Sequence, residues 1–198
     1  MPSKLVCSAC GARYDPGPDE PWRCTCGEPL DFADRPLPAG PPENLDVSRG
    51  LWAFEDLLPV EPRVTLGEGW TPTAESDYWD ATFKLEYVFP SGSFKDRGAT
   101  TTLSRAAELG VEQVVEDSSG NAGAAIAQYA ARAGIDADIY VPAAAKASKL
   151  KAIERVGATP VPVDGSRQDV TDACVAAVED GDAWYASHAW NPAFFAGT

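Results

Sequence analysis

The sequence predicts an α/β fold, a parallel sheet with flanking helices, and three observations predict it. From residue 94 onward, stretches with helical apolar periodicity alternate with short β-type runs. A glycine follows each of four predicted helices, as helix C-termini favour: Gly110, Gly134, Gly157 and Gly181. A polar loop with glycines, residues 117–123, follows a β-type run and opens a helix, where parallel sheets bind ligands.

The helices are expected at 94–109, 122–133, 148–156 and 168–179, and the strands at 111–116, 137–141, 160–163 and 183–187. Alternation of this kind forms right-handed βαβ units, which place a ligand at the carboxyl ends of the strands. A further strand is expected near 82–87, after an irregular stretch that contains glycine and proline.

The segment PSGSFKDRGA, residues 90–99, is typical of a loop that turns into a helix. Gly92 allows a positive φ and Ser93 is a good N-cap, so Lys95 falls in the first helical turn. The helix macrodipole there disfavours an ammonium, and Phe94 lies alongside, so the position suits a neutral amine for Schiff-base chemistry. The alternative is an ordinary solvated lysine with charged neighbours.

The loop DSSGNAG, residues 117–123, joins a predicted strand to a predicted helix. Such a loop aims backbone N–H groups outward and can bind an anion, a carboxylate as well as a phosphate. The alternative is a plain N-cap with a tight turn, because Ser, Asn and Gly are common there.

Together the two motifs resemble the pyridoxal-phosphate enzymes of the tryptophan synthase β-subunit fold (fold type II), and within them the threonine synthases. The resemblance covers roughly residues 51–198. It extends to four further segments: the lead-in 50–59, GEGWTP at 67–72, KLE at 84–86, and NP…GT at 191–198.

The resemblance implies that Lys95 is the catalytic lysine that holds pyridoxal 5'-phosphate, and that Asn121 contacts the 3′-oxygen of this cofactor. It also implies that loop residues bind the substrate carboxylate: Ser118, Ser119, Gly120, Asn121 and Ala122. The expected activity is that of a threonine synthase-like lyase, which converts O-phosphohomoserine and water to threonine and phosphate. The alternatives are a threonine or serine dehydratase-like lyase, and a non-catalytic zinc-ribbon interaction module with a decayed enzyme half.

The C-terminal segment departs from this family at four positions. Phe194 stands where many threonine synthases have an arginine for the substrate phosphate, and Ala196 replaces the usual glutamate. His188 and Ala189 replace a common Asn-Ser pair, and His188 is also interpretable as a polar residue at a strand end. These departures leave the substrate open while the cofactor chemistry stays intact.

Four of the five cysteines lie in the first 26 residues: Cys7, Cys10, Cys24 and Cys26. Four thiolates from two short turns suit a tetrahedral zinc, and the pattern resembles the zinc ribbon that some threonine synthases carry. The second pair is C-x-C where C-x-x-C is usual, and a disulfide framework is the alternative. Cys174 is expected to be core, because it shares an apolar helix face with Val170 and Val178.

Three regions are expected: a zinc-ribbon-like segment at 1–30, a Pro-rich linker at 31–46, and the N-terminal part of a pyridoxal-phosphate catalytic domain at 47–198. The resemblance implies a second half with a glycine-rich loop for the cofactor phosphate, and no such loop is found in this sequence. A truncated chain is therefore expected. The expected protein partner is either another copy in a homo-oligomer or a complementing C-terminal half.

Thirty acidic and sixteen basic residues give a net charge of −14. So acidic a chain argues against nucleic acid and membrane partners. The resemblance described above implies a small-molecule amino acid as the partner. The charge indicates a halophile-like, salt-adapted protein, with an ordinary acidic protein as the alternative. No signal-peptide-like or membrane-spanning apolar run is present in the sequence, so a cytoplasmic location is expected.

Overall fold

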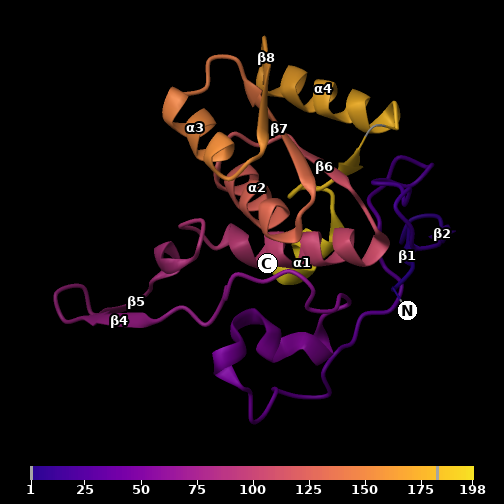
Figure 1. Ribbon diagram of the computed structural model, residues 1–198. Coiled ribbons are helices and arrows are strands. Elements are labelled where there is room, and N and C mark those ends of the chain that lie inside the picture. The colour runs from indigo at the N-terminus through magenta and orange to yellow at the C-terminus, as the bar shows by residue number, and fades with distance from the viewer. Residues whose placement is uncertain (1, 182) are drawn as a thin grey trace.

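The computed structural model describes residues 2–181 and 183–198, and a parallel sheet forms its centre (Figure 1). Its strands are β6 (Gln113–Glu116), β7 (Asp136–Pro142), β8 (Thr159–Val163) and β9 (Trp184–Tyr185). They lie in the order β8-β7-β6-β9, and every neighbouring pair is parallel. The predicted α/β class with a parallel sheet is therefore confirmed.

The helices that cover this sheet are α1 (Lys95–Leu109), α2 (Asn121–Ala133), α3 (Ala147–Arg155), α4 (Arg167–Glu179) and α5 (Pro192–Gly197). Successive side chains of a strand point to opposite faces. Accordingly Val114 packs in the large core formed with α1, α2 and α3, whereas Val115 packs with Cys174 of α4 on the other face. The prediction that Cys174 is a core residue is confirmed, since its side chain is fully buried. No helix of the described ranges combines the length and the apolarity that a bilayer crossing needs.

The predicted helix and strand positions from residue 94 onward are confirmed, with shifts of a few residues at the ends. All four predicted C-terminal glycines have positive φ, and Gly110 and Gly134 are themselves the C-caps of α1 and α2. Such glycines end helices without the steric cost that a Cβ would bring. The last strand is shorter than expected, although the Ala186 amide still donates to the Val115 carbonyl.

The strand expected at 82–87 is wrong in its second half. Strand β5 (Ala81–Lys84) pairs with β4 (Thr73–Ser76) in a hairpin that projects from the body (Figure 1), and Glu86–Val88 form a 3₁₀ helix, η2. The Glu86 carboxylate accepts hydrogen bonds from the Thr71 hydroxyl at 2.5 Å and from the Arg97 guanidinium. These tertiary contacts outweigh the local β propensity and turn the chain toward α1.

The N-terminal segment forms a small antiparallel sheet, in the order β2-β1-β3, from β1 (Leu5–Val6), β2 (Arg13–Tyr14) and β3 (Asp31–Phe32). Strand β3 lies inside the stretch that was expected to be a linker, so the folded segment extends at least to Phe32. The reason is apolar burial, because the side chains of Leu30 and Phe32 pack in the same small cluster as Leu5.

One buried cation ties this segment to α1. Arg105 of α1 is 1% exposed and donates to the Glu20 carboxylate at 2.7 Å and to the Ser3 carbonyl at 2.7 Å. It also donates to Glu108 at 3.2 Å. Charged groups buried together in this way fix the position of the segment on the helix, because separating them would leave a buried charge without its partner.

Glu68 organises the GEGWTP loop as a structural carboxylate. Its side chain is 1% exposed and accepts hydrogen bonds from Trp52 Nε1 (2.8 Å), the Thr100 hydroxyl (2.8 Å) and the Tyr129 hydroxyl (2.9 Å). Trp52 belongs to the 3₁₀ helix η1 (Val47–Leu57), and the other two donors belong to α1 and α2. This one residue therefore joins the lead-in segment to both helices that face the candidate site.

Candidate active site

Lys95 is the first residue of α1, and the helix position puts it at the carboxyl edge of the sheet. Helix α1 ends at Leu109 and leads into the amino end of β6, so its own beginning lies at the opposite edge. The predicted positive φ of Gly92 is confirmed at +84°. Ser93 was expected to be the N-cap; the N-cap is instead Phe94, and the Ser93 hydroxyl accepts from the Lys95 amide at 3.2 Å.

Two aromatic rings flank the Lys95 amine. Its Nζ lies 4.6 Å from the centroid of the Phe94 ring and 5.7 Å from that of Phe194. Phe94 is 40% exposed, whereas Phe194 is buried at 2%. The amine therefore lies between a fixed apolar wall from α5 and a more open ring from its own helix, a setting that suits a planar group bound to the lysine.

The position of Phe194 depends on close packing between α1 and α5. A Cβ at Gly98 would lie 2.4 Å from the Phe194 ring, and one at Gly197 would lie 2.2 Å from the Arg97 carbonyl. Contacts this short are not tolerated, so only glycine allows the two helices to approach this closely. The lysine and its apolar wall are thus held by two glycines.

The second motif lies at the same edge of the sheet, because α2 follows the carboxyl end of β6. A Cβ at Gly123 would lie 1.8 Å from the Ser118 carbonyl oxygen, so the loop folds back directly onto the helix. The Ser118 hydroxyl accepts from the Gly120 amide at 3.2 Å. Gly120 is the N-cap of α2, and no side chain of the described residues caps this helix. Its first N–H groups therefore remain suited to an anion.

The individual loop residues predicted for binding differ in accessibility. Asn121 is exposed, and Ser118, Ser119 and Gly120 are partly buried. The Ala122 side chain is buried in the core at 3%, so only its backbone N–H could serve a ligand. The topology thus brings Lys95 and the 118–122 loop to one edge of the sheet.

A cluster that the sequence prediction missed lies at the ends of β6 and β9. Glu116 is fully buried, and its Oε1 lies 2.6 Å from Nδ1 of His188. Its Oε2 accepts from the His188 amide at 3.2 Å. The hydrogen bond to Glu116 raises the pKa of His188, against the effects of burial and of the nearby Lys95 charge. The sequence feature that could have indicated this cluster is a pair of acidic residues at the end of a predicted buried strand, in a chain with one histidine.

Asp117, beside this pair, is neutralised by other partners. Its Oδ2 accepts from Arg167 at 2.7 Å and from the Thr171 hydroxyl at 2.7 Å, and its Oδ1 accepts from the Tyr185 hydroxyl at 3.0 Å. Burial opposes its ionisation, but the hydrogen bonds from Thr171 and Arg167 outweigh burial and hold the pKa of Asp117 below its usual range. Although oxygen and nitrogen atoms of Glu116, Asp117 and His188 lie within 4.8 Å of one another, these partners satisfy the carboxylate without a cation.

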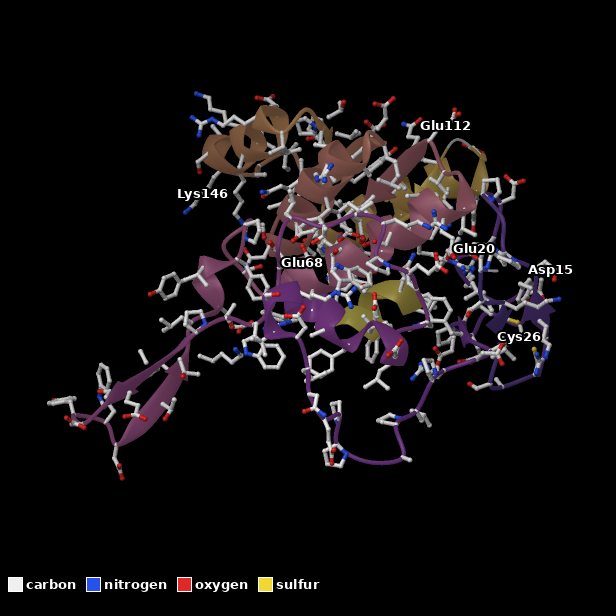
Figure 2. The ribbon with its side chains drawn as sticks, turned by 60° about the horizontal axis from the view of Figure 1, so that its bottom comes forward. Asp15, Glu20, Cys26, Glu68, Glu112 and Lys146 are labelled. Carbon is white, nitrogen blue, oxygen red and sulfur yellow. The ribbon has the colours of Figure 1, made fainter. Side chains whose placement is uncertain are left out.

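The four predicted metal ligands come together in the N-terminal segment. The sulfurs of Cys7, Cys10, Cys24 and Cys26 all lie within 4.8 Å of one another, with 3.6 Å between Cys7 and Cys26 and 3.5 Å between Cys10 and Cys24. A tetrahedral zinc with Zn–S bonds of about 2.3 Å places its sulfurs roughly 3.8 Å apart, so the donor set fits this ion. The Cys26 amide and then the Tyr14 hydroxyl lower the pKa of the Cys24 thiol to about 6, which favours the thiolate. Figure 2 shows Cys26 and Asp15 on the side of the molecule away from Lys146.

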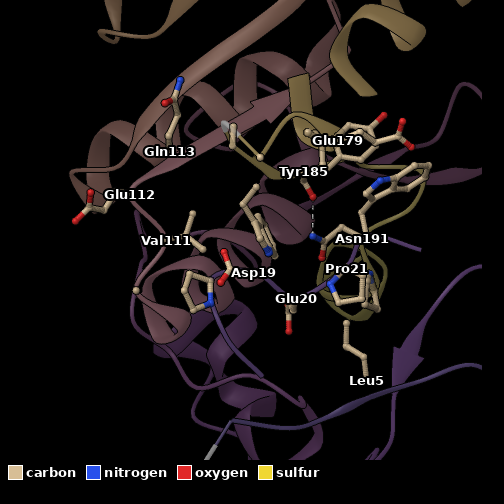
Figure 3. Close-up of a pocket in the computed structure, with 18 residues that line it drawn as sticks. Leu5, Asp19, Glu20, Pro21, Val111, Glu112, Gln113, Glu179, Tyr185 and Asn191 are labelled. Carbon is tan, nitrogen blue, oxygen red and sulfur yellow. Dashed lines mark hydrogen bonds between the residues drawn. The ribbon is translucent and has the colours of Figure 1, made fainter. Parts of the chain in front are cut away.

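A cleft of about 680 Å³ lies elsewhere, between the N-terminal segment and the sheet (Figure 3). One wall includes Glu20 of the N-terminal segment. The other includes Gly110–Gln113 and Trp184, at the amino ends of β6 and β9. Lys95 does not line it. The cleft is therefore separate from the carboxyl edge where the two motifs meet.

Comparison with known proteins supplies the family. A sequence profile described as "Pyridoxal-phosphate dependent enzyme" matches residues 64–198. The chain belongs to the pyridoxal-phosphate-dependent enzyme family. It is 32% identical to the threonine synthase of Methanocaldococcus jannaschii over 182 residues, covering 84% of this chain and 44% of that protein. It is 39% identical to the threonine synthase of Synechocystis over 134 residues, covering 61% and 35%.

Solved structures agree with this family and its fold. A pyridoxal 5'-phosphate-dependent aspartate racemase is similar with a TM-score of 0.60 and 30% identity, over 64% of this chain and 42% of that one. The maize serine racemase is similar with a TM-score of 0.57 and 30% identity, over 64% and 41%. The expected fold type II is therefore confirmed for a part of the domain, and the chain spans less than half the length of the relatives it matches.

Proposed function

We propose that this chain carries the lysine half of a threonine synthase-like active site, for the conversion of O-phosphohomoserine and water to threonine and phosphate. The observation that carries the proposal is Lys95, at the carboxyl edge of the sheet and between two aromatic rings. The relatives named threonine synthase support the reaction class. We propose pyridoxal phosphate as the cofactor of the site; when bound, it acts as an electron sink for carbanion chemistry at the substrate.

The residues of this chain have distinct proposed roles. Lys95 would hold the aldehyde of the cofactor through its side-chain amine, and the same amine would hold and return protons at the substrate carbons. The Asn121 side chain contacts the 3′-oxygen of the cofactor. The N–H groups and hydroxyls of residues 118–122 hold the substrate carboxylate, for which an uncapped helix N-terminus is suited.

A zinc ion in the cysteine cluster and a second half of the catalytic domain belong to the same proposal. The zinc would stabilise the N-terminal segment, which extends at least to Phe32, and the proposed catalytic region begins at residue 47. The remaining cofactor contacts would come from a complementing half or from a second copy of the protein, since this chain covers only 44% of the M. jannaschii relative and 35% of the Synechocystis relative.

Phe194 favours a second candidate, a threonine or serine dehydratase-like lyase. Its buried ring lies 5.7 Å from the lysine amine. The guanidinium groups of Arg97 and Arg167 bind the carboxylates of Glu86 and Asp117. An apolar wall suits a substrate that loses hydroxide better than one that carries a phosphate, because an ion gains nothing from an apolar surface.

Trapping the cofactor tests the proposal. The chain, joined to the part of the M. jannaschii threonine synthase that follows the matched region, is incubated with pyridoxal phosphate and reduced with borohydride. We expect one pyridoxyl group on Lys95 by peptide mass spectrometry, and none in Lys95→Met. Asn121→Ala should keep the label and shift the absorbance of the bound cofactor. Label on Lys84 or Lys146 in place of Lys95 would refute the assignment.

The products then separate the two candidates. A threonine synthase-like site releases phosphate and threonine from O-phosphohomoserine. A dehydratase-like site releases ammonia and a 2-oxo acid from threonine or serine and leaves O-phosphohomoserine unchanged.

A further inference from the structure

The Glu116–His188 pair is a titratable unit at the candidate site that the roles above do not use. Glu116 is 0% exposed and accepts from both the ring and the amide of His188. Two contacts to one buried carboxylate fix both the position and the tautomer of the imidazole, since Nδ1 must carry the proton that it donates. A histidine oriented by a buried carboxylate is the arrangement that proton-transfer sites use.

The other ring nitrogen is the one that remains for a ligand. Among the described residues, Nε2 of His188 has no hydrogen-bond partner, and the His188 side chain is 28% exposed, so this nitrogen can be reached. The imidazole lies edge-on to Phe194, with 6.1 Å between the ring centroids. Phe194 is also the wall of Lys95, so the imidazole and the amine lie on one aromatic ring.

The charges around His188 support a proton held at this place. From β6, Glu116 bonds the ring and Asp117 lies beside it, although Asp117 is itself paired with Arg167. From α1, the charge of Lys95 opposes protonation of the imidazole, which means that the two groups influence each other electrostatically. The hydrogen bond to Glu116 outweighs this effect, so the pKa of His188 lies above its ordinary value.

We propose that His188, oriented by Glu116, is a second proton-transfer residue of the site and gives its Nε2 proton to the leaving group of the amino-acid substrate. This inference rests on the proposed function, in which Lys95 handles the proton on the substrate carbon. When a hydroxyl is the leaving group, the C–O bond breaks and the oxygen departs with the bonding electron pair. The oxygen takes the Nε2 proton to become water, and the neutral imidazole regains a proton from solvent.

The chemistry of the leaving group gives the reason for such a residue. Hydroxide is a poor leaving group and needs a proton, whereas phosphate leaves as a stable anion. General acid catalysis of this kind contributes about 10²–10⁴-fold to rate. His188 would therefore matter most for the dehydratase-like reaction that Phe194 favours.

The placement is tested first on the chain itself, because it contains one histidine. Its ¹⁵N imidazole signals are followed by NMR as a function of pH. We expect the Nδ1–H tautomer at high pH, a lower His188 pKa in Glu116→Gln, and a higher one in Lys95→Met, where an opposing charge is lost. Lys149→Met, which removes an exposed lysine, is the matched control and should change nothing.

A His188 pKa that is unchanged in Lys95→Met, or that moves equally in Lys149→Met, would show that the imidazole does not face the site and would overturn the proposal. If Glu116→Gln fails to fold, the Lys95→Met comparison still decides. Pyridoxal labelling of Lys95 tests the proposed function separately. If Lys95 is not labelled, the proposed function fails, and the NMR titration still tests the position of His188.

Kinetics of the fused protein with the complete catalytic domain provide the second arm. His188→Gln should slow the loss of hydroxide from serine or threonine by about 10²–10⁴-fold, and the loss of phosphate from O-phosphohomoserine far less. Borohydride trapping on Lys95 should stay as in the wild type. Equal slowing for both leaving groups would mean that His188 has only a structural role.

Discussion

The N-terminal segment and the α/β body of this protein are stabilised in different ways. The body buries a large continuous core from α1, α2, α3 and the sheet. In the segment around β1, β2 and β3, a few apolar side chains are buried together with two cysteines. Segments below about 40 residues rarely bury enough surface to fold alone. The difference teaches that the body is stabilised by its own packing, whereas the segment buries few apolar side chains and is held by contacts with the body such as the Arg105–Glu20 pair.

Removal of the metal ligands should have the largest effect on this comparison. In the double variant Cys24→Ser, Cys26→Ser we expect loss of about one zinc per chain and loss of protection in residues 1–30, because structural zinc supplies roughly 10–16 kcal/mol in small peptides. Amide hydrogen exchange and metal analysis measure both. Helices α1 and α2 should keep their protection. Full zinc content in this variant would contradict the four-cysteine site.

Replacement of the buried cation between the two regions should rank second. Arg105→Met leaves the carboxylates of Glu20 and Glu108 buried without their partner, and breaking a buried pair costs about 3–5 kcal/mol. Burial already raises the pKa of Glu20, so this carboxyl should take up a proton in the variant. Urea unfolding measures the loss. The control Arg23→Met breaks an exposed pair with Glu179 and should cost about 0–1 kcal/mol of unfolding free energy. A similar loss in both variants would show that the buried pair does not hold the N-terminal segment on α1.

A methyl group in the 117–123 loop tests the packing of the body. Gly123→Ala places a Cβ 1.8 Å from the Ser118 carbonyl, and we expect destabilisation of about 3 kcal/mol, because an overpacked core must shift its backbone. Gly120→Ala is the matched control, since its Cβ would lie 3.6 Å from the nearest atom at an ordinary φ of −101°. Thermal unfolding of both measures the difference. Equal melting temperatures would show that the loop does not fold back onto α2 as described.

The smallest expected effect is a loss of stability at acidic pH, and it should arise in the α/β body. The pKa of Asp117 is held below its usual range, so its contribution to stability is present above the pKa of the unfolded aspartate and is lost as pH falls through the folded value. Urea unfolding between about pH 3 and 6 should show a stability that decreases toward acid, less steeply in Asp117→Asn. Glu154→Gln on the surface of α3 should leave the slope unchanged; an unaltered slope in Asp117→Asn would exclude this contribution.

Most elements of the sheet and its helices could be predicted, because periodicity and helix-ending glycines are local signals. The Glu116–His188 contact could not be predicted in this way. It requires that β9 lies next to β6, and strand order is a property of the whole sheet that alternating elements leave open. The roles of Glu68 and Glu86 were missed for the same reason, since their partners are distant in the sequence.

The candidate site shows the same division. Lys95 and the 118–122 loop were predicted because each lies at the beginning of a helix, where Gly, Ser and Asn in the sequence favour a turn and a helix N-terminus. The wall formed by Phe194 was visible in the sequence only as a departure from a resembling family. Its burial and its distance from Lys95 depend on how α5 packs on α1, which no local pattern encodes.

The close contact between α1 and α5 also has a mechanical consequence. Because Gly98 and Gly197 have no side chains, α1 and α5 approach until the Phe194 ring and the backbone are in contact. These two residues, which need never touch a substrate, therefore set how far the Phe194 ring lies from the lysine. A single added methyl at Gly98 would act as a spacer and push Phe194 outward. The position of the Phe194 ring relative to the Lys95 amine therefore depends on the helix crossing, and a substitution at the crossing changes it while both of these residues stay the same.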